Sequence, residues 1–416
     1  MNEQFDSPLF GSPVAGTEDS GEHAPRRGAM IRTSPLANHA GDLKALARRR
    51  LPRIVYDFLE GGSHDEISMR RNRADFDALF LRQRVFDHFA ARKSQANMLG
   101  QRASMPVGLA PIGMSGVFYP RAEICVARAA AAFGVPYCLS TLATCSIEEV
   151  SAAAGGPFLF QLFMMKDRAI NASLLERAAE AKCPGLVVNV DTAVQGRRNR
   201  DLDNGVTIPL NLRLWHLFDL VRRPRWVARY LGNKPTLANL APYAPGDSKD
   251  LASVSDWAEP RFKGAVHTED LEWLRQQWPG TLIVKGVLDP EDVKIALDLG
   301  ADSVVVSNHG GRQLEGAPST IEMVPRIRDA VGDDAELILD SGVRSGFDVL
   351  KALGRGANGC LVGRAYIYGL AAHGEQGVAA ALHLLAQELD EAMTLTGTGN
   401  VNALPENLVF GPSSRG

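Results

Sequence analysis

Short apolar runs recur along the chain and alternate with stretches of helical character. Eight runs are apolar almost throughout, which is typical of strands that are buried on both faces. They are PVGLA (106–110), VPYCLS (135–140), PFLFQLF (157–163), GLVVNVD (185–191), TLIVKG (281–286), DSVVVS (302–307), AELILD (335–340) and NGCLVG (358–363). Ala- and Leu-rich stretches of helical character lie between them, at residues 122–134, 171–182, 290–300 and 346–356. The pattern predicts a parallel sheet covered by helices.

The number of runs decides between two architectures of the α/β class. Eight strands, each followed by a helix, fit a (β/α)8 TIM barrel better than an open, doubly wound sheet. No GxGxxG pattern follows the first run, which argues against a dinucleotide-binding sheet. The rhythm breaks once, where residues 200–270 form a long insertion. We therefore predict a TIM barrel with an insertion after its fourth strand.

The two ends of the chain lack this rhythm. Residues 1–38 are rich in Ser, Gly, Pro and acidic side chains, so we expect a disordered N-terminal tail. The segment GDLKALARRRLP then predicts a short helix with Asp42 as its N-cap. The barrel domain is expected over residues 39–400, with a C-terminal tail over residues 401–416.

Composition narrows the class of protein. With 416 residues, 45% of them hydrophobic, the chain can bury the core of one large domain or of two ordinary ones. A net charge of -3 gives no support for a nucleic-acid partner. Five scattered cysteines without CxxC spacing suggest neither a disulfide framework nor a zinc site, and we expect no metal. The chain has no signal-like start and no apolar run long enough to cross a bilayer, which favours a cytoplasmic location.

Polar residues gather where the predicted strands end. The stretch SNHGGRQLE, which follows DSVVV directly, places two glycines between a histidine and an arginine. The polar residues and the accompanying glycine are Ser140, Gln161, Asn189, Asp191, Lys285, Ser307, His309, Arg312, Asp340, Gly363 and Arg364. Any one of them could serve stability alone, as a satisfied core histidine or an ion pair. Together they predict a catalytic rim, because the active sites of such barrels lie at the carboxyl ends of the strands.

The last two strands lead into loops suited to a phosphate group. ILDSGVRSGFD (338–348) and CLVGRAYIYG (360–369) both combine glycine with arginine at the position where barrels bind phosphate. Glycine lets the backbone approach an anion closely, and the guanidinium supplies charge. The glycines concerned are Gly342, Gly346 and Gly363, and the arginines are Arg344 and Arg364. The alternative is ordinary turn glycines beside surface arginines.

With these residues in place, the chain resembles the FMN-dependent 2-hydroxy acid oxidoreductases over about residues 40–395. SNHGGRQL is close to the signature of that family, and seven further stretches match in order. They are LPRIVYDFLEGGSHDE, LSTLATCSIEEV, QLFMMKDR, VDTAVQGRR, LIVKGV, DSGVRSG and GRAYIYGLAAHGEQGV. Within the family, the chain is most similar in character to the mandelate and L-lactate dehydrogenases.

The resemblance implies roles that suit the chemistry. His309 matches the family's base, and Asp191 matches the acid that bonds its other ring nitrogen. Arg198 and Arg312 match the pair that grips the substrate carboxylate. Lys285 matches the cation beside the flavin N1–C2 carbonyl, where negative charge collects in the reduced ring. The glycines of SNHGGRQLE would then leave room for substrate and flavin between the base and its clamp.

The resemblance also implies an FMN site. Contacts to the isoalloxazine ring are expected from Pro111, Ile112, Gly113, Ser140, Gln161, Asn189, Lys285 and Ser307. Contacts to the ribityl chain and phosphate are expected from Asp340, Gly342, Arg344, Gly363 and Arg364.

The chain departs from the family pattern beside the expected substrate. Phe58 and Phe163 stand where the family usually has tyrosines, so two hydroxyls that could bond the substrate are missing. We expect a more apolar pocket and a substrate with an aromatic or long alkyl side chain. Asn189 in place of Thr and Ala193 in place of Pro are milder departures. Gly113, where the oxidases more often have Ala, weakly favours a dehydrogenase that passes electrons to a quinone or another carrier.

Part of the insertion has its own pattern. Residues 208–235 resemble the stretch that can contact a membrane in mandelate and respiratory lactate dehydrogenases. An apolar helical face is flanked by aromatic residues and arginines, as an interfacial helix requires. The apolar face comprises Leu210, Leu214, Leu217 and Val221, the aromatics are Trp215, Phe218 and Trp226, and the arginines are Arg213, Arg222, Arg223, Arg225 and Arg229. A lid over the barrel mouth or a contact with another subunit fits equally well.

The favoured function is FMN-dependent oxidation of a 2-hydroxy acid, of the S form as in most relatives, to the 2-oxo acid. The electron acceptor would be a quinone, another carrier or O2, and the resemblance implies a homotetramer that is cytoplasmic or peripheral on the inner face of the membrane. Alternatives are an oxidase or monooxygenase, or a flavin barrel whose substrate is not a simple 2-hydroxy acid. A non-redox FMN barrel, such as the similar type 2 isopentenyl diphosphate isomerase, and an inactive binding barrel are further alternatives.

Overall fold

Eight parallel strands form the central sheet of the computed structural model, which describes residues 37–86, 91–205, 214–247 and 249–411. The strands are β4 (Val107–Leu109), β5 (Cys138–Ser140), β6 (Leu159–Leu162), β7 (Gly185–Asn189), β8 (Thr281–Val287), β9 (Ser303–Val306), β10 (Glu336–Asp340) and β11 (Gly359–Val362). Their order is β4-β11-β10-β9-β8-β7-β6-β5. A parallel bridge between Leu109 and Tyr137 joins β4 to β5 and closes the barrel. All eight strand predictions are confirmed.

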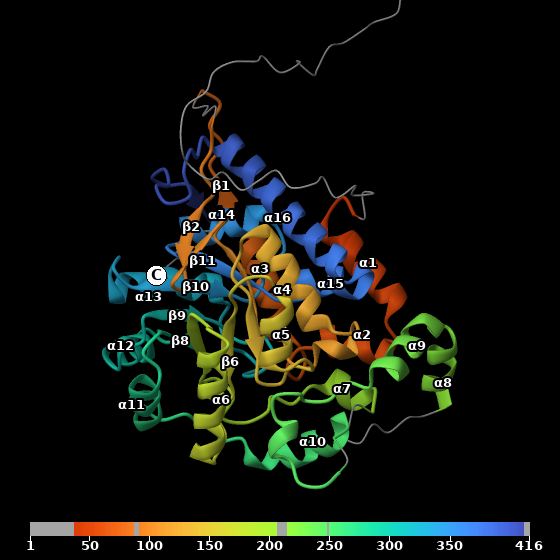
Figure 1. Cartoon of the computed structure of the whole chain (residues 1–416). Helices are drawn as coiled ribbons and strands as arrows, with labels where there is room; N and C mark the ends of the chain where they lie inside the picture. Colours follow the sequence, from red (N-terminus) through yellow and green to blue (C-terminus); the bar gives the residue numbers. More distant parts are fainter. Residues whose placement is uncertain (1–36, 87–90, 206–213, 248, 412–416) are drawn as a thin grey trace, which may run out of the picture. The chain divides into compact units, whose positions relative to one another are not determined.

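Helices follow the strands and surround them (Figure 1). They are α4 (Ala122–Phe133), α5 (Ile147–Ala153), α6 (Arg168–Glu180), α11 (Thr268–Gln277), α12 (Pro290–Asp298), α13 (Thr320–Val331), α14 (Gly346–Gly354) and α15 (Arg364–His373), with the 3-10 turn η1 (Ser115–Val117) before α4. The four predicted helical stretches coincide with α4, α6, α12 and α14, and each extends one or two residues beyond the end of its helix. The TIM-barrel prediction is therefore correct.

The alternation of side chains along each strand sets the position of the polar residues. One buried apolar cluster includes Cys138, Leu159, Val187, Ile283 and Ile338. Two residues further along the same strands come five polar residues, and side chains two apart point to the same face of a strand. These are Ser140, Gln161, Asn189, Lys285 and Asp340. The barrel interior is therefore filled by apolar side chains, and the polar side chains lie above them at the carboxyl ends of the strands.

Three helices precede the barrel: α1 (Ala40–Arg50), α2 (Arg53–Glu60) and α3 (Ile67–Asp77). The prediction that Asp42 is the N-cap of the first helix is wrong, because the helix begins after His39. Asp42 is the third helical residue, and its carboxylate accepts hydrogen bonds from the backbone N–H groups of Asn38 and His39. It caps the helix by reaching back, as the acidic partner of a capping box does.

The chain remains packed beyond residue 400. After the long helix α16 (Glu375–Thr396), Val401 and Leu408 are buried. The strand β12 (Val409–Phe410) pairs with β1 (Phe80–Leu81), and β2 (Ala96–Met98) pairs with β3 (Gln101–Ala103) in a separate hairpin. The predicted C-terminal tail therefore begins inside ordered chain, whereas residues 1–36 of the predicted N-terminal tail lie outside the described residues.

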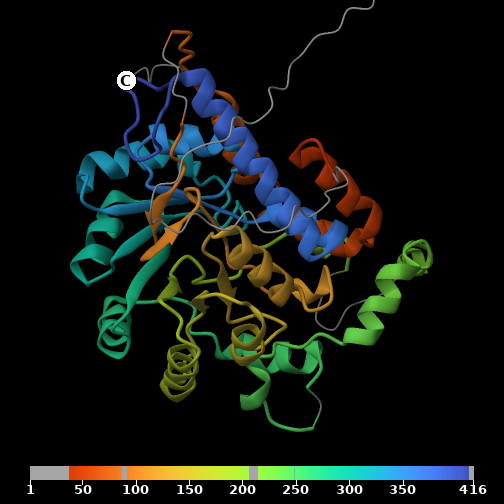
Figure 2. The same cartoon turned by 45° about the horizontal axis from the view of Figure 1, so that its top comes forward.

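The insertion between β7 and α11 contains α7 (Asn199–Asp203), α8 (Leu214–Val221), α9 (Pro224–Asn233), α10 (Leu251–Ala258) and the 3-10 turns η2 (Ala241–Tyr243) and η3 (Glu259–Arg261). Helices α8 and α9 extend outward from the barrel beside α1 and α2 (Figures 1 and 2). A bridge between Met165 and Phe262 ties the end of the insertion to the chain after β6. No helix in the described ranges is both long and apolar enough to cross a bilayer.

Candidate active site

A cavity of about 500 Å³ lies at the carboxyl ends of the strands. This volume is within the roughly 300–1,000 Å³ of pockets that enclose a cofactor or small ligand. The predicted residues that line it are Phe58, Pro111, Ile112, Gly113, Ser140, Gln161, Phe163, Asn189, Arg198, Lys285, His309, Arg312, Asp340, Gly342, Arg344, Gly363 and Arg364. Asp191, Ser307 and Gly346 are the predicted residues outside this lining, and Asp191 and Ser307 each contact a residue within it.

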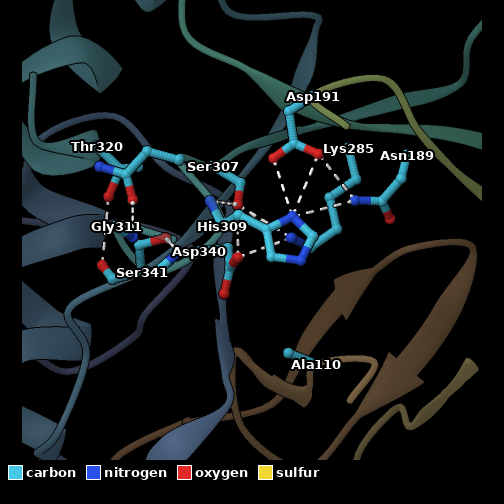
Figure 3. Close-up of polar contacts among 12 residues, drawn as sticks. Ala110, Asn189, Asp191, Lys285, Ser307, His309, Gly311, Thr320, Asp340 and Ser341 are labelled. Atoms are coloured by element: carbon cyan, nitrogen blue, oxygen red, sulfur yellow. Dashed lines mark hydrogen bonds and ion pairs between the residues drawn. The ribbon is translucent and has the colours of Figure 1, made fainter. Parts of the chain in front are cut away.

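His309 and Asp191 form a hydrogen-bonded pair (Figure 3). The ring atom Nδ1 lies 3.1 Å from Oδ2 and 3.2 Å from Oδ1 of Asp191. Burial acts to raise the pKa of Asp191, but His309 and Lys285 outweigh it, and the net shift is downward. The carboxylate is thus kept ionised beside the imidazole. The pairing occupies Nδ1 and leaves Nε2 as the ring nitrogen that can exchange a proton with a ligand.

The backbone of SNHGGRQLE explains its two glycines. His309, Gly310 and Gly311 all have left-handed φ values of 58°, 70° and 75°, a conformation that glycine adopts without strain. A Cβ atom on Gly310 would lie 2.8 Å from Nη1 of Arg364, and one on Gly311 would lie 2.5 Å from the backbone of Met69. The glycines therefore let the chain turn tightly between the histidine and Arg312.

Lys285, Asp340 and Ser307 form a buried network behind the cavity. Nζ of Lys285 lies 2.8 Å from Oδ2 of Asp340 and donates to Oγ of Ser307 at 3.0 Å. The Ser307 hydroxyl donates to Asp340 at 2.6 Å and accepts from the backbone N–H of His309. Burial opposes the charge on both ionised groups. The mutual attraction outweighs it, raising the pKa of Lys285 and lowering that of Asp340.

Four arginines line the same cavity: Arg198, Arg312, Arg344 and Arg364. The Arg198 and Arg312 guanidinium carbons lie 5.4 Å and 5.3 Å from the ring centre of Phe58, at cation–π distance. Burial, together with nearby Arg198 and Arg364, lowers the pKa of Arg312 well below its usual value. This concentration of positive charge favours an anionic ligand.

One carboxylate partly offsets this charge. Oδ2 of Asp201 lies 2.9 Å from Nε of Arg198. Burial nevertheless raises the pKa of Asp201 despite the neighbouring Arg198 and Arg312. Asp201 was not predicted, although its place three residues after Arg198 in a polar stretch is a signal of such a pair.

Two buried amides in the cavity have unused hydrogen-bonding atoms. The Ser140 hydroxyl donates to Oε1 of Gln161 at 2.7 Å, and Nε2 of that glutamine has no partner. The Asn189 side chain donates to Asp191 at 3.0 Å, and its Oδ1 has no partner. A buried polar atom without a partner is costly. One free donor and one free acceptor fit the polar edge of the flavin ring that the sequence predicts.

The loops after β10 and β11 enter the same cavity through Gly342, Arg344, Gly363 and Arg364. Arg364 donates hydrogen bonds to the backbone carbonyls of Leu59, Gly61 and Gly310, contacts that the sequence did not indicate. Gly346 has a different role from the phosphate contact predicted for it. A Cβ atom there would lie 2.0 Å from the backbone nitrogen of Leu389, so this glycine allows α14 to pack on α16.

Aromatic side chains form a wall that sequence reasoning found only in part. Phe58 stacks on Phe118 with ring centres 6.1 Å apart. Phe163 stacks on His309 at 6.4 Å and meets Phe262 edge-on at 6.2 Å. Phe118 and Phe262 also line the cavity. Neither lies in a periodic pattern or a strand end, so no sequence signal pointed to them.

Comparison with known proteins gives a consistent result. The family model described as FMN-dependent dehydrogenase matches residues 47–410. The L-lactate dehydrogenase of Caulobacter sp. (strain K31) is 43% identical over 370 residues, covering 88% of this chain and 97% of the relative. The L-lactate dehydrogenase of Ectopseudomonas mendocina (strain ymp) is 40% identical over 370 residues, with 88% and 97% coverage.

Among solved structures, the monotopic membrane protein (S)-mandelate dehydrogenase superposes with a TM-score of 0.86 at 35% identity, covering 90% of this chain and 99% of that one. A mandelate oxidase bound to (S)-4-hydroxymandelic acid gives a TM-score of 0.75 at 37% identity, with 88% and 96% coverage.

Proposed function

Because the chain belongs to the FMN-dependent dehydrogenase family, we propose that it oxidises a 2-hydroxy acid with a bulky apolar or aromatic side chain to the 2-oxo acid. The observation that carries the proposal is the convergence of the His309–Asp191 pair and two arginines on one cavity. An imidazole beside two guanidinium groups suits a substrate that has both a carboxylate and a neighbouring hydroxyl to deprotonate.

His309 is proposed as the base. Oxidation to the 2-oxo acid removes the hydroxyl proton, the hydrogen on the α-carbon and, in total, two electrons. Bound FMN would supply the two-electron acceptor for this chemistry. Nε2 of His309 takes the proton from the substrate, because Nδ1 is held by Asp191. The ionised Asp191 then stabilises the imidazolium that forms. Lys285 is proposed to supply a cation that would stabilise negative charge on bound FMN.

Arg198 and Arg312 are proposed to bind the substrate carboxylate. A guanidinium can donate two parallel hydrogen bonds to a carboxylate. Arg312 is fixed by its bonds to the backbone carbonyls of Phe58 and Gly61, and Arg198 by Asp201. Such fixed donors would hold the substrate in one orientation relative to His309. The S form is proposed because most members of the family act on it.

The remaining cavity residues are proposed to hold FMN. Ring contacts are assigned to Pro111, Ile112, Gly113, Ser140, Gln161, Asn189, Lys285 and Ser307, and ribityl and phosphate contacts to Asp340, Gly342, Arg344, Gly363 and Arg364. The unpartnered atoms of Gln161 and Asn189 support the ring assignment. We expect purified protein to be yellow and to release FMN on denaturation.

The aromatic wall supports a bulky substrate. Phe58 and Phe163 lack the hydroxyls of the usual tyrosines, and Phe118 and Phe262 extend the apolar surface. An apolar side chain on the substrate would gain by leaving water for this surface. Under argon, mandelate-type acids are expected to bleach the flavin faster than lactate or glycolate. Faster bleaching by lactate would refute the proposed substrate class. An absence of bleaching with every acid tested would point to a non-redox or binding role.

Restoring the hydroxyls should shift this preference. In the Phe58→Tyr/Phe163→Tyr variant, each hydroxyl can bond a substrate oxygen, worth about 0.5–1.5 kcal/mol. For lactate this bond should raise kcat/KM by about 2- to 10-fold per hydroxyl. A mandelate-type acid should gain less, because the same hydroxyls make the wall beside its side chain more polar, so the lactate-to-mandelate ratio should rise. Steady-state assays with both acids measure the ratio. Phe410→Tyr, on the distant strand β12, is the matched control and should leave the ratio unchanged.

We further propose a dehydrogenase that passes electrons to a quinone or another carrier, and not primarily to O2. A Cβ atom on Gly113 would lie 2.9 Å from Cβ of Leu142, so alanine, which is more usual in the oxidases, would crowd this wall. After anaerobic reduction by substrate, we expect slow reoxidation in air and prompt reoxidation by a soluble quinone. Flavin absorbance follows both reactions, and prompt reoxidation by air alone would contradict the prediction.

Peripheral membrane contact through residues 208–235 is also proposed. On α8, Phe218 and Val221 are 75% and 78% exposed, and exposed arginines lie directly beyond them, as in an interfacial helix. The Phe218→Asp/Val221→Asp variant should lose most of its co-sedimentation with vesicles. Val85 and Phe86 are equally apolar and exposed. Their paired change to Asp should leave co-sedimentation intact. Equal loss in both variants would remove this proposal.

The homotetramer implied by the family resemblance remains part of the proposal. Light scattering should then give about four times the chain mass of 44.9 kDa.

A further inference from the structure

A second, smaller cavity of about 230 Å³ lies between α1, η1 and the start of α9. Phe118 lines both this cavity and the candidate active site. Leu51, Val117 and Trp226 add further apolar surface. The volume is below the roughly 300–1,000 Å³ of pockets that enclose whole drug-sized ligands, so the cavity suits one small group.

The remaining lining is strongly basic. Six arginines line the cavity, and no aspartate or glutamate does so: Arg49, Arg50, Arg222, Arg223, Arg225 and Arg229. Within the described part of the chain, no ion pair joins any of the six to a carboxylate. Asp219, on the adjacent helix α8, instead accepts a hydrogen bond from the backbone N–H of Arg53. The cavity therefore concentrates cations that no carboxylate among the described residues neutralises.

Neutral contacts hold several of these arginines in place. Nε of Arg223 donates to the backbone carbonyl of Leu51 at 3.2 Å. The Arg229 guanidinium lies 4.7 Å from the ring centre of Tyr119. Trp226 donates from its indole N–H to the carbonyl of Val117 at 2.9 Å, which fastens α9 against η1. These bonds position positive charge without neutralising it.

The arginines also act on one another. Arg50 donates to the carbonyl of Ala372 and lies 3.3 Å from Nε2 of His373. Burial lowers the pKa of Arg50, and nearby Arg229 and Arg225 lower it further. Burial, Arg50 and Arg229 likewise lower the pKa of His373. The neutral form of this imidazole is therefore favoured, and it does not offset the positive charge of the arginines. An anion in the cavity would relieve this repulsion.

We propose that this cavity binds a phosphate group, carried either by a small soluble phosphomonoester or by a lipid headgroup. A phosphate has several acceptor oxygens and up to two negative charges, so it can bond several guanidinium groups at once. A single carboxylate offers fewer acceptors and one charge. The apolar side of the cavity, at Leu51 and Trp226, would accept the carbon group next to the phosphate.

The test uses the full-length enzyme loaded with FMN, so that the flavin phosphate site is already filled. Calorimetry with sn-glycerol 3-phosphate measures binding to the wild type, to Arg49→Gln/Arg225→Gln and to Arg48→Gln/Lys234→Gln. Arg48 and Lys234 are exposed neighbours on or at the end of the same two helices but do not line the cavity. Both double variants lose the same charge. We expect the cavity variant to bind at least about tenfold more weakly, and the control to stay within about twofold.

Equal weakening in both double variants, or no binding to the wild type of either glycerol phosphate or phosphatidate vesicles, would overturn the proposal. Vesicles of phosphatidylcholine with and without phosphatidate distinguish the two sources. Tight binding of dissolved glycerol phosphate with no gain from phosphatidate supports a soluble phosphomonoester. Weak binding in solution with a phosphatidate-dependent gain, lost only in the cavity variant, supports a lipid headgroup. Phe218→Asn/Val221→Asn, which removes the apolar groups without adding charge beside Arg222, should leave glycerol phosphate binding unchanged, and this separates the site from the apolar contact proposed for α8.

Discussion

Replacing His309 with Gln is expected to slow flavin reduction by substrate about 10²- to 10⁴-fold, the range attributed to a positioned acid–base group. Glutamine cannot take up the hydroxyl proton at neutral pH, although its amide can still bond Asp191. The rate is measured by anaerobic stopped-flow absorbance at saturating substrate. FMN content should be unchanged, because the His309 side chain is bonded to Asp191, and only the backbone N–H, which the substitution keeps, contacts the Lys285–Asp340 network through Ser307.

Two comparisons make this result specific. Binding of the 2-oxo acid product, followed by its effect on the flavin spectrum, should persist in His309→Gln because Arg198 and Arg312 remain. His383→Gln, an exposed histidine on α16, carries the same chemical change away from the cavity and should react at the wild-type rate. A loss smaller than about tenfold in His309→Gln would mean that another group takes the proton.

The barrel could be predicted because its strands are buried on both faces. Such strands are apolar throughout, so each run stood out from the helical stretches beside it. The polar residues were identified from their place at the end of each run, and the two-residue alternation explains why they follow the apolar stack, as Lys285 follows Ile283. The rim of the candidate site was therefore readable from strand ends alone.

Contacts between segments far apart in sequence could not be predicted in this way. Arg364 lines the cavity, but the carbonyls of α2 and of the chain after β9 that its guanidinium bonds could not be predicted. Gly346 resembled a phosphate-loop glycine, but close packing of α16 explains it. The partners of Phe58 and Phe163 come from η1 and the insertion, where no periodicity marks a side chain that faces the cavity. Only the folded backbone brings these groups together.

The same distinction applies to Lys285, whose residue type was predicted but whose partner was not. The Lys285→Met variant is expected to be about 3–5 kcal/mol less stable than the wild type, because it leaves the carboxylate of Asp340 buried without a cation. Thermal and urea unfolding measure the change. Arg326→Met removes an exposed cation from Glu322 and should cost no more than about 1 kcal/mol.

A second substitution separates the lost ion pair from a lost contact with the cofactor. Both Lys285→Met and Lys285→Met/Asp340→Asn lack any lysine–FMN contact, but only the single variant retains a buried carboxylate. The double variant should therefore be the more stable of the two. If both variants are equally unstable, the lost stability does not come from the broken ion pair. It then comes from the lost contact with the flavin or from the lost packing of the lysine side chain.

The pH dependence of stability provides an independent check, because the contribution of Asp340 changes with pH in opposite directions in the wild type and in Lys285→Met. In the wild type Lys285 lowers the pKa of Asp340, so the stability from this group is present above the unfolded value of 3.8 and is lost only as the pH falls below it. In Lys285→Met, burial of Asp340 is opposed only by the Ser307 hydrogen bond and by His309, so the pKa of Asp340 should rise above that value. The variant should then regain stability as the pH falls from about 8 to about 5, because a protonated Asp340 no longer needs a cation. Over the same interval the contribution of Asp340 to the stability of the wild type should stay constant. A stability difference between wild type and variant that stays constant over this interval would show that Asp340 is not left as an unpaired charge.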